Sequence, residues 1–206
     1  MLSELQIHIQ LFILLYADDT VIFAESPDKM QISLNNFQEY CKLWKLDVNV
    51  SKTKVMVFSK RKNRQNHRFV LNDKTLDIVD FFTYLGINFK FNGCFVNARK
   101  GLIEQALKSI FSTFRKIRNQ AIPVDIQLKL FDSLVEPILL YGSEIWGYED
   151  LKLLEQTHLK FCNIILNVRS TTPNYMVYGE LGRYPLDIKV KLRMLNFWNQ
   201  AIFYTD

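Results

Sequence analysis

The sequence predicts an α+β fold, in which a small antiparallel sheet with one packed helix is followed by an all-helical bundle. In the first 97 residues, short segments rich in β-branched and aromatic residues alternate with turn residues, which is typical of strands. From about residue 98 the apolar residues recur at helical spacing. Because 49% of the 206 residues are apolar, the chain can form a substantial core. We expect two domains, residues 1–97 and 98–206.

The first part should contain a β-hairpin, one amphipathic helix and several short strands. Residues 9–16 and 20–25 are apolar runs on either side of a short turn, which predicts the hairpin. Ser26-Pro27-Asp28 suits a helix start. Apolar spacing then predicts a helix through about residue 46. Further strands are expected over residues 55–58, 69–71, 76–79 and 83–91, with turns at 72–73 and 92–93.

The second part should be helical throughout. Its apolar spacing predicts helices over residues 98–117, 126–135, 151–166 and 188–203. Pro137 can begin one more, since proline is tolerated in the first turn. Trp146 and Trp198 are expected to lie in the core or to pack between helices. The histidines, His8, His67 and His158, are too scattered to suggest a metal site.

Charge and cysteine content limit the class of protein. The net charge of +5 is compatible with a nucleic-acid partner. The three cysteines show no Cys-x-x-Cys spacing, which favours free thiols in a reducing compartment and so an intracellular protein, with nucleus and cytoplasm both compatible. No apolar run approaches the about 20 residues of a membrane span. A buried-strand pattern starts within ten residues of Met1, so we expect the chain to be the later part of a longer sequence.

Tyr16-Ala17-Asp18-Asp19 lies at the expected tip of the hairpin. Carboxylate oxygens are the ligands that Mg²⁺ prefers. A two-metal site uses such ligands to place ions on the attacking and leaving oxygens of a phosphoryl transfer. The alternative is an ordinary turn, because Asp readily bonds to its own backbone there.

Three further motifs follow the Asp pair in a fixed order. They are Asn49-Val50-Ser51-Lys52-Thr53-Lys54, then Tyr84-Leu85-Gly86, then Tyr141-Gly142-Ser143-Glu144-Ile145-Trp146-Gly147. This ordered set resembles the reverse transcriptases of non-LTR (LINE-type) retrotransposons. The resemblance implies a partial polymerase palm, formed by the small sheet and its helix, followed by a helical thumb-like bundle.

The resemblance also implies roles for individual residues. Asp18 and Asp19 would hold Mg²⁺, and Lys52 would protonate or neutralise the departing pyrophosphate. Tyr84, Leu85 and Gly86 would form the primer grip. The partners would be an RNA template and a DNA primer. Without the resemblance, the favoured interpretation of Lys52 is a solvated turn lysine, and that of Tyr84 is a core aromatic.

Two basic stretches are candidates for phosphate contacts. They include Lys60, Arg61, Lys62, Arg64, Arg99 and Lys100. The alternative is a solvated surface, which charge runs commonly form.

The resemblance implies that this chain is one part of an RNA-directed DNA polymerase, which is a nucleotidyltransferase. The family's palm takes another metal-binding aspartate from upstream of the Asp-Asp hairpin, and its fingers also lie upstream. We therefore expect the chain alone to be catalytically incomplete. Two alternatives remain: a non-catalytic nucleic-acid-binding module, and a transposon relic without function.

Overall fold

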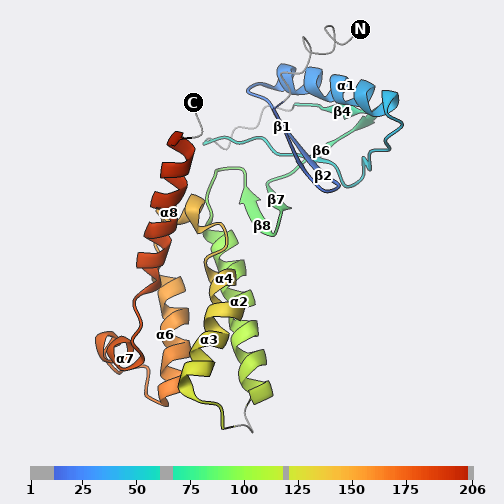
Figure 1. Cartoon of the computed structure of the whole chain (residues 1–206). Helices are drawn as coiled ribbons and strands as arrows, with labels where there is room; N and C mark the ends of the chain where they lie inside the picture. The colour runs from blue at the N-terminus through green and yellow to red at the C-terminus, as the bar shows by residue number, and fades with distance from the viewer. Residues whose placement is uncertain (1–11, 61–66, 118–120, 204–206) are drawn as a thin grey trace. The chain divides into compact units, whose positions relative to one another are not determined.

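The computed structural model describes residues 12–60, 67–117 and 121–203 (Figure 1). The predicted α+β fold class is confirmed, with small strand pairs in the first part and helices in the second. The chain forms two compact units. The first unit runs up to Phe82 and includes Lys90–Gly93; the helical unit comprises Thr83–Phe89 and the chain from Cys94 onward. The domain division at residue 97 stays a prediction, and residues 83–89 cluster with the helices.

The predicted hairpin is confirmed in the first unit. Strands β1 (Phe12–Tyr16) and β2 (Asp19–Phe23) pair antiparallel, with Tyr16 opposite Asp19. Ala17 connects them with a φ of 52°, a left-handed conformation that a tight turn requires. The strand faces of β1 are less buried than its apolar sequence suggests, since Leu14 and Leu15 are exposed. Each strand of a two-stranded hairpin has only one paired neighbour, so many of its side chains stay exposed to solvent.

Helix α1 (Pro27–Leu43) packs on β2 and β4. The Ser26 Oγ accepts a hydrogen bond from the Lys29 amide at 3.2 Å, which caps the helix as its sequence predicts. Leu34 and Cys41 are buried. The predicted continuation to residue 46 is wrong: Lys45 has a φ of 55°, which ends the helix.

The remaining strands of the first unit are shorter than predicted and pair two by two. They are β3 (Lys54–Val55), β4 (Val70–Leu71), β5 (Lys74–Thr75) and β6 (Asp77–Ile78). β3 pairs with β6 in parallel, and β4 with β5 antiparallel around a left-handed Asn72-Asp73 turn. The side-chain amide of Gln31 donates to the Val70 carbonyl and accepts from its amide, both at 2.9 Å. Gln31 therefore satisfies both backbone groups of Val70 and joins α1 to β4.

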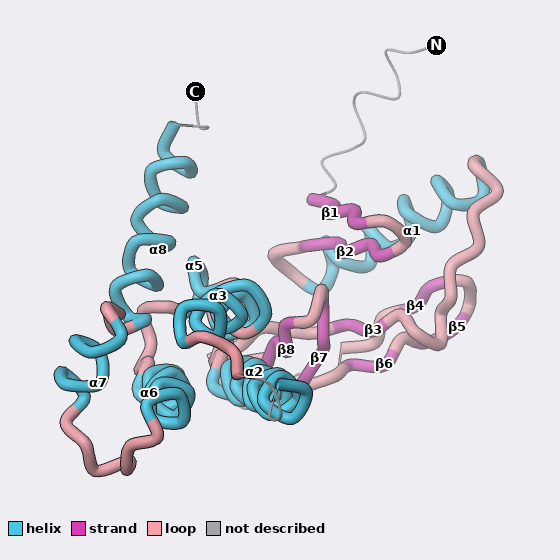
Figure 2. The backbone as a smooth tube through the Cα atoms, turned by 60° about the horizontal axis from the view of Figure 1, so that its bottom comes forward, coloured by secondary structure: helices cyan, strands magenta, loops and turns pink. Residues whose placement is uncertain are grey.

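Strand β7 (Phe81–Tyr84) pairs with strand β8 (Ile87–Lys90). Residues Thr83–Phe89 of this strand pair belong to the helical unit, and the outer ends of the two strands belong to the first unit. The helices that follow are α2 (Val96–Ile117), α3 (Val124–Leu134), α4 (Glu136–Leu139), α5 (Ser143–Trp146), α6 (Lys152–Leu166), α7 (Asn174–Leu181) and α8 (Leu186–Phe203). Figure 1 and Figure 2 show α2, α3 and α6 side by side. The predicted helices are confirmed, whereas α5 and α7 are short helices that the apolar spacing did not indicate.

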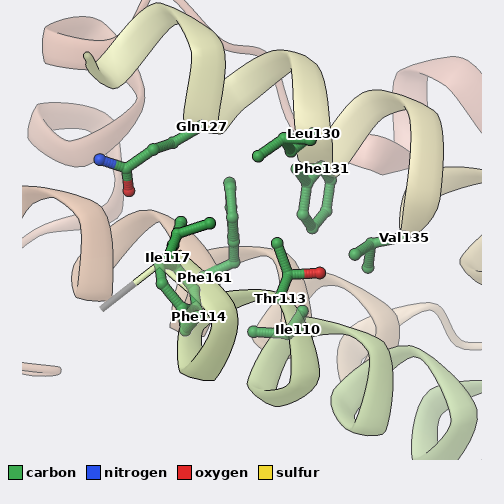
Figure 3. Close-up of a pocket in the computed structure, with 9 residues that line it drawn as sticks. All are labelled: Ile110, Thr113, Phe114, Ile117, Gln127, Leu130, Phe131, Val135 and Phe161. Atoms are coloured by element: carbon green, nitrogen blue, oxygen red, sulfur yellow. The ribbon is translucent and has the colours of Figure 1, made fainter. Parts of the chain in front are cut away.

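The core of the helical unit is closely packed. Phe131 of α3 stacks on Phe161 of α6, with ring centroids 4.2 Å apart. The void that these rings line with residues of α2 has a volume of only about 10 Å³ (Figure 3). Even one water molecule needs about that much space. This void is a packing defect, too small for a ligand.

Trp146 and Trp198 differ in burial, although both were expected in the core. Trp146 is 1% exposed, which confirms the prediction, but Trp198 is 62% exposed. The burial of Leu186, Val190 and, in part, Met194 shows that α8 packs through its first half. From Leu195 onward the described residues of α8 are exposed. Within the described ranges, no helix has the length and apolarity that crossing a membrane requires.

Candidate metal and nucleic-acid site

The Asp hairpin, residues 12–23, places two carboxylates at its tip. Asp18 is in the turn itself, and Asp19 is the first residue of β2, fixed by its pairing with Tyr16. Both aspartates are exposed. The backbone pairing thus places two consecutive aspartates at the exposed tip of the hairpin.

The Asp pair fits Mg²⁺ by the chemistry of its oxygen donors. Mg²⁺ is commonly held by one or two carboxylates, with water and substrate phosphates completing the octahedron. Among the described residues no group of three or more His, Cys, Asp or Glu could hold a metal ion. Asp18 and Asp19 are therefore the residues that could hold Mg²⁺ here, as a pair without a third protein ligand among the described residues.

Lys52 lies in a turn that Asn49 organises. The Lys52 amide donates to the Asn49 carbonyl at 3.1 Å and to its side-chain oxygen at 3.2 Å. The Lys52 side chain is exposed, whereas nearby Lys54 pairs with Asp77 at 2.7 Å. Across the described part of the chain, no hydrogen bond or ion pair joins Lys52 to the Asp hairpin. The structure does not bring these predicted catalytic groups into contact.

The turn between β7 and β8, here called the 84–86 turn, is a tight reversal. Leu85 has a φ of 46° and Gly86 a φ of 80°, so both are left-handed. Two successive left-handed residues are the signature of a type I′ hairpin. Tyr84 is half-buried and Leu85 is 36% exposed.

The 141–147 segment contacts this turn. The Tyr141 hydroxyl donates to the Leu85 carbonyl at 2.7 Å. Gly142 has a φ of 68°, and a Cβ there would lie 2.6 Å from Ile87 Cδ1. The indole N–H of Trp146 donates to the Tyr141 carbonyl at 3.0 Å. The sequence motif therefore joins the helices to the 84–86 turn, which sequence reasoning missed.

Three cations project from one side of α2. Lys100, Lys108 and Arg115 are exposed, and at 3.6 residues per turn they lie within about 80° around the helix axis, an arc that also contains the exposed Glu104. We call these three residues the cationic face. Exposed cations of this kind can contact phosphates of a nucleic-acid backbone.

The other predicted phosphate contacts differ in their surroundings. Arg99 is only 13% exposed and forms an ion pair with Glu149 and a hydrogen bond to the Asp150 carbonyl, so its charge is neutralised within the protein. Lys60 is exposed. Three more lie outside the described residues: Arg61, Lys62 and Arg64.

A buried polar network joins the helices, and sequence reasoning missed it too. His158 is fully buried; its Nε2 accepts from Arg183 at 3.1 Å and its Nδ1 lies 3.3 Å from Glu155. Tyr178 donates to Glu155, as does the Leu186 amide at 2.8 Å. Burial works to raise the pKa of Glu155, but the hydrogen bonds from His158, Tyr178 and the Leu186 amide hold it below the usual value. The only sequence signal was the i, i+3 spacing of a Glu and a His.

Comparison with known proteins places these features in context. Residues 1–89 match the family model described as "Reverse transcriptase (RNA-dependent DNA polymerase)". The chain is 30% identical over 191 residues to an uncharacterized transposon-derived protein of Caenorhabditis elegans. This match covers 88% of the chain and 65% of that relative. No solved structure matches the chain significantly. The first 89 residues are therefore reverse transcriptase-like, and the chain is similar to a transposon-derived protein.

Proposed function

We propose that the chain is part of an RNA-directed DNA polymerase, the reverse transcriptase of a non-LTR (LINE-type) retrotransposon. The observation that carries this proposal is the Asp hairpin, in which strand pairing presents Asp18 and Asp19 together at an exposed tip. This hairpin lies within the reverse transcriptase-like residues 1–89. The Lys52 turn and the 84–86 turn follow it in the order that the family resemblance requires.

Each residue in this proposal has a defined task. Asp18 and Asp19 bind Mg²⁺, which stabilises charge on the attacking and leaving oxygens when it is bound. The Asn49 turn holds the backbone amide of Lys52, and the Lys52 ammonium group donates a proton to the departing pyrophosphate or neutralises its charge. Positioned proton donors of this kind contribute about 10²–10⁴-fold to a rate.

Nucleic acid is the proposed partner of the helical unit. The 84–86 turn contacts the DNA primer, with Tyr84 available for stacking on a base or sugar. The cationic face of α2 contacts phosphates of the primer–template duplex. Such binding is electrostatic and indifferent to sequence, so it weakens steeply as salt rises.

Metal binding is tested with Mn²⁺, which accepts the same oxygen ligands as Mg²⁺ and broadens nearby NMR signals. We expect Mn²⁺ to broaden the amide signals of Asp18 and Asp19 in the chain. The double replacement Asp18→Asn and Asp19→Asn should abolish the effect, whereas replacing exposed Asp47 by Asn should leave it intact. Broadening that survives the double replacement would contradict the metal assignment.

Phosphate contact is tested by the salt dependence of binding to a B-form DNA duplex. Replacing the cationic face, Lys100, Lys108 and Arg115, by Ala should reduce the slope of log affinity against log salt by up to about 2.7, at about 0.9 per lost contact. A control with equal loss of charge replaces exposed residues elsewhere: Lys29, Lys42 and Lys74. Equal slopes for the two triple variants would exclude a specific role for α2.

A second candidate is a nucleic-acid-binding module without catalysis, which the cationic face also favours. Both candidate functions predict that duplex binding weakens as salt rises, but only the polymerase requires a metal ion at Asp18 and Asp19. Binding that depends on the cationic face, together with Mn²⁺ broadening that is missing at Asp18 and Asp19, would favour the second candidate.

A further inference from the structure

We propose that Tyr141 is a positioning residue that fixes the conformation of the 84–86 turn. The role of Tyr141 in shaping the turn stands on geometry alone. Its consequence for nucleic-acid binding rests on the proposed function, in which this turn contacts the primer.

The turn needs support from outside its own sequence. Type I′ turns require a positive φ at both central residues, which is why Asn-Gly and Gly-Gly are the favoured pairs. Here the first central residue is Leu85, with a φ of 46°. Leucine rarely adopts this conformation, because its Cβ approaches the following carbonyl oxygen. The sequence Leu85-Gly86 therefore does not select the turn by itself.

Tyr141 supplies that support through its hydroxyl and its ring. The hydroxyl donates to the carbonyl of Leu85, the strained residue itself, at 2.7 Å. The ring edge faces Gly86, since a Cβ built on Gly86 would lie at van der Waals distance, 3.8 Å, from Tyr141 Cε1. Leu85 is thus bonded to, and Gly86 lies beside, one side chain that is 56 positions from Leu85 in the sequence.

Tyr141 and its neighbour Leu140 are themselves held by hydrogen bonds from other side chains of the helical unit. The indole N–H of Trp146, a side chain that is 1% exposed, donates to the Tyr141 carbonyl at 3.0 Å. Arg193 of α8 donates to the adjacent Leu140 carbonyl at 2.9 Å. Gly142 allows close approach to Ile87 of β8, where any larger residue would collide. The packing of α5 and α8 therefore determines where the Tyr141 hydroxyl lies.

The direct test is hydrogen exchange of the turn amides in the whole chain. Tyr141→Phe keeps the ring and removes only the hydroxyl. We expect the amides of Gly86 and Ile87 to exchange about 2- to 12-fold faster, the factor that corresponds to one net hydrogen bond. The matched control is Tyr148→Phe, since Tyr148 is 67% exposed and the described structure shows no hydrogen bond from its hydroxyl. Unchanged exchange in Tyr141→Phe would overturn the inference.

A rescue separates turn geometry from general destabilisation. Leu85→Asn creates the Asn-Gly pair that adopts a type I′ turn without outside help. Added to Tyr141→Phe, it should return the exchange of Gly86 and Ile87 to the slow rate. If the double variant exchanges as fast as Tyr141→Phe alone, the loss of the hydroxyl acts elsewhere, and the inference fails.

Duplex binding then distinguishes failure of this inference from failure of the proposed function. Tyr84→Ala removes the proposed stacking residue, and Tyr141→Phe should weaken binding without changing its salt dependence, because no cation is lost. If Tyr84→Ala leaves affinity unchanged, the turn does not contact nucleic acid, and the proposed function fails there while the exchange result stands. If Tyr84→Ala weakens binding and Tyr141→Phe does not, the positioning role is wrong.

Discussion

Gly147 is the position where the structure leaves least room for a side chain. A Cβ added there would lie 2.3 Å from Val190 Cγ1, 2.5 Å from the Ser143 carbonyl oxygen and 2.8 Å from Met194 Sδ. Non-bonded carbon atoms normally lie about 3.5–4.0 Å apart. The added methyl group would therefore overlap Val190 by about 1 Å.

The neighbours of Gly147 cannot easily move aside. Val190 is fully buried in the core, and the Ser143 oxygen belongs to the backbone of α5. Gly147 has a φ of −66°, which any residue can adopt, so the effect is purely steric. Overpacking of this kind costs about 1–3 kcal/mol. We predict that Gly147→Ala lowers the free energy of unfolding by that amount.

The assay is urea unfolding followed by circular dichroism, with Gly101→Ala as the control. Gly101 is within α2, and no described atom lies within 4 Å of a Cβ built there. The control should gain about 0.5–1 kcal/mol, because Ala loses less conformational freedom than Gly in a helix. A Gly147→Ala variant as stable as the unmodified chain would refute the packing of α5 on α8.

Two further predictions concern titratable groups of the helical unit. The pKa of Glu155 lies below its ordinary value of 4.5, so its interactions stabilise the fold fully above that pH and are lost as pH falls through the lower folded value. Urea unfolding on either side of pH 4.5 should show this loss, and Glu155→Gln should remove it. Burial raises the pKa of the Cys162 thiol to about 12, so iodoacetamide should label Cys162 only after unfolding, as measured by mass spectrometry. Labelling of Cys162 at the same rate in the folded chain would show that α6 opens readily.

Local sequence signals predicted most of the regular elements. The start of α1 is determined by Ser26, which caps the helix, and by Pro27, which is its first residue. The hairpin follows from two apolar runs on either side of Ala17 and Asp18. These interactions join residues that are close in the sequence, so the local sequence is sufficient to predict the elements.

The contacts that shape the candidate site join residues far apart in the sequence. Tyr141 and Leu85 are each unremarkable in their own segments, and only packing of the whole helical unit brings them together. Burial of tryptophan shows the same limit. Trp146 and Trp198 both occur among apolar helical residues, but Trp146 is buried whereas Trp198 is mostly exposed. A pattern shows that a face is apolar and does not say which element covers it.

The central claim is that Asp18 and Asp19 form part of a polymerase metal site, and primer extension tests it most directly. The 206-residue chain alone should extend no primer on an RNA template with Mg²⁺ and deoxynucleotides, because two-metal catalysis needs more carboxylate donors than this pair supplies. A fusion with the upstream palm and fingers of a related reverse transcriptase should extend the primer. In that fusion Asp18→Asn should abolish extension, Lys52→Ala should slow it, and Asp47→Asn should leave it unchanged. Extension that survives Asp18→Asn would contradict the claim.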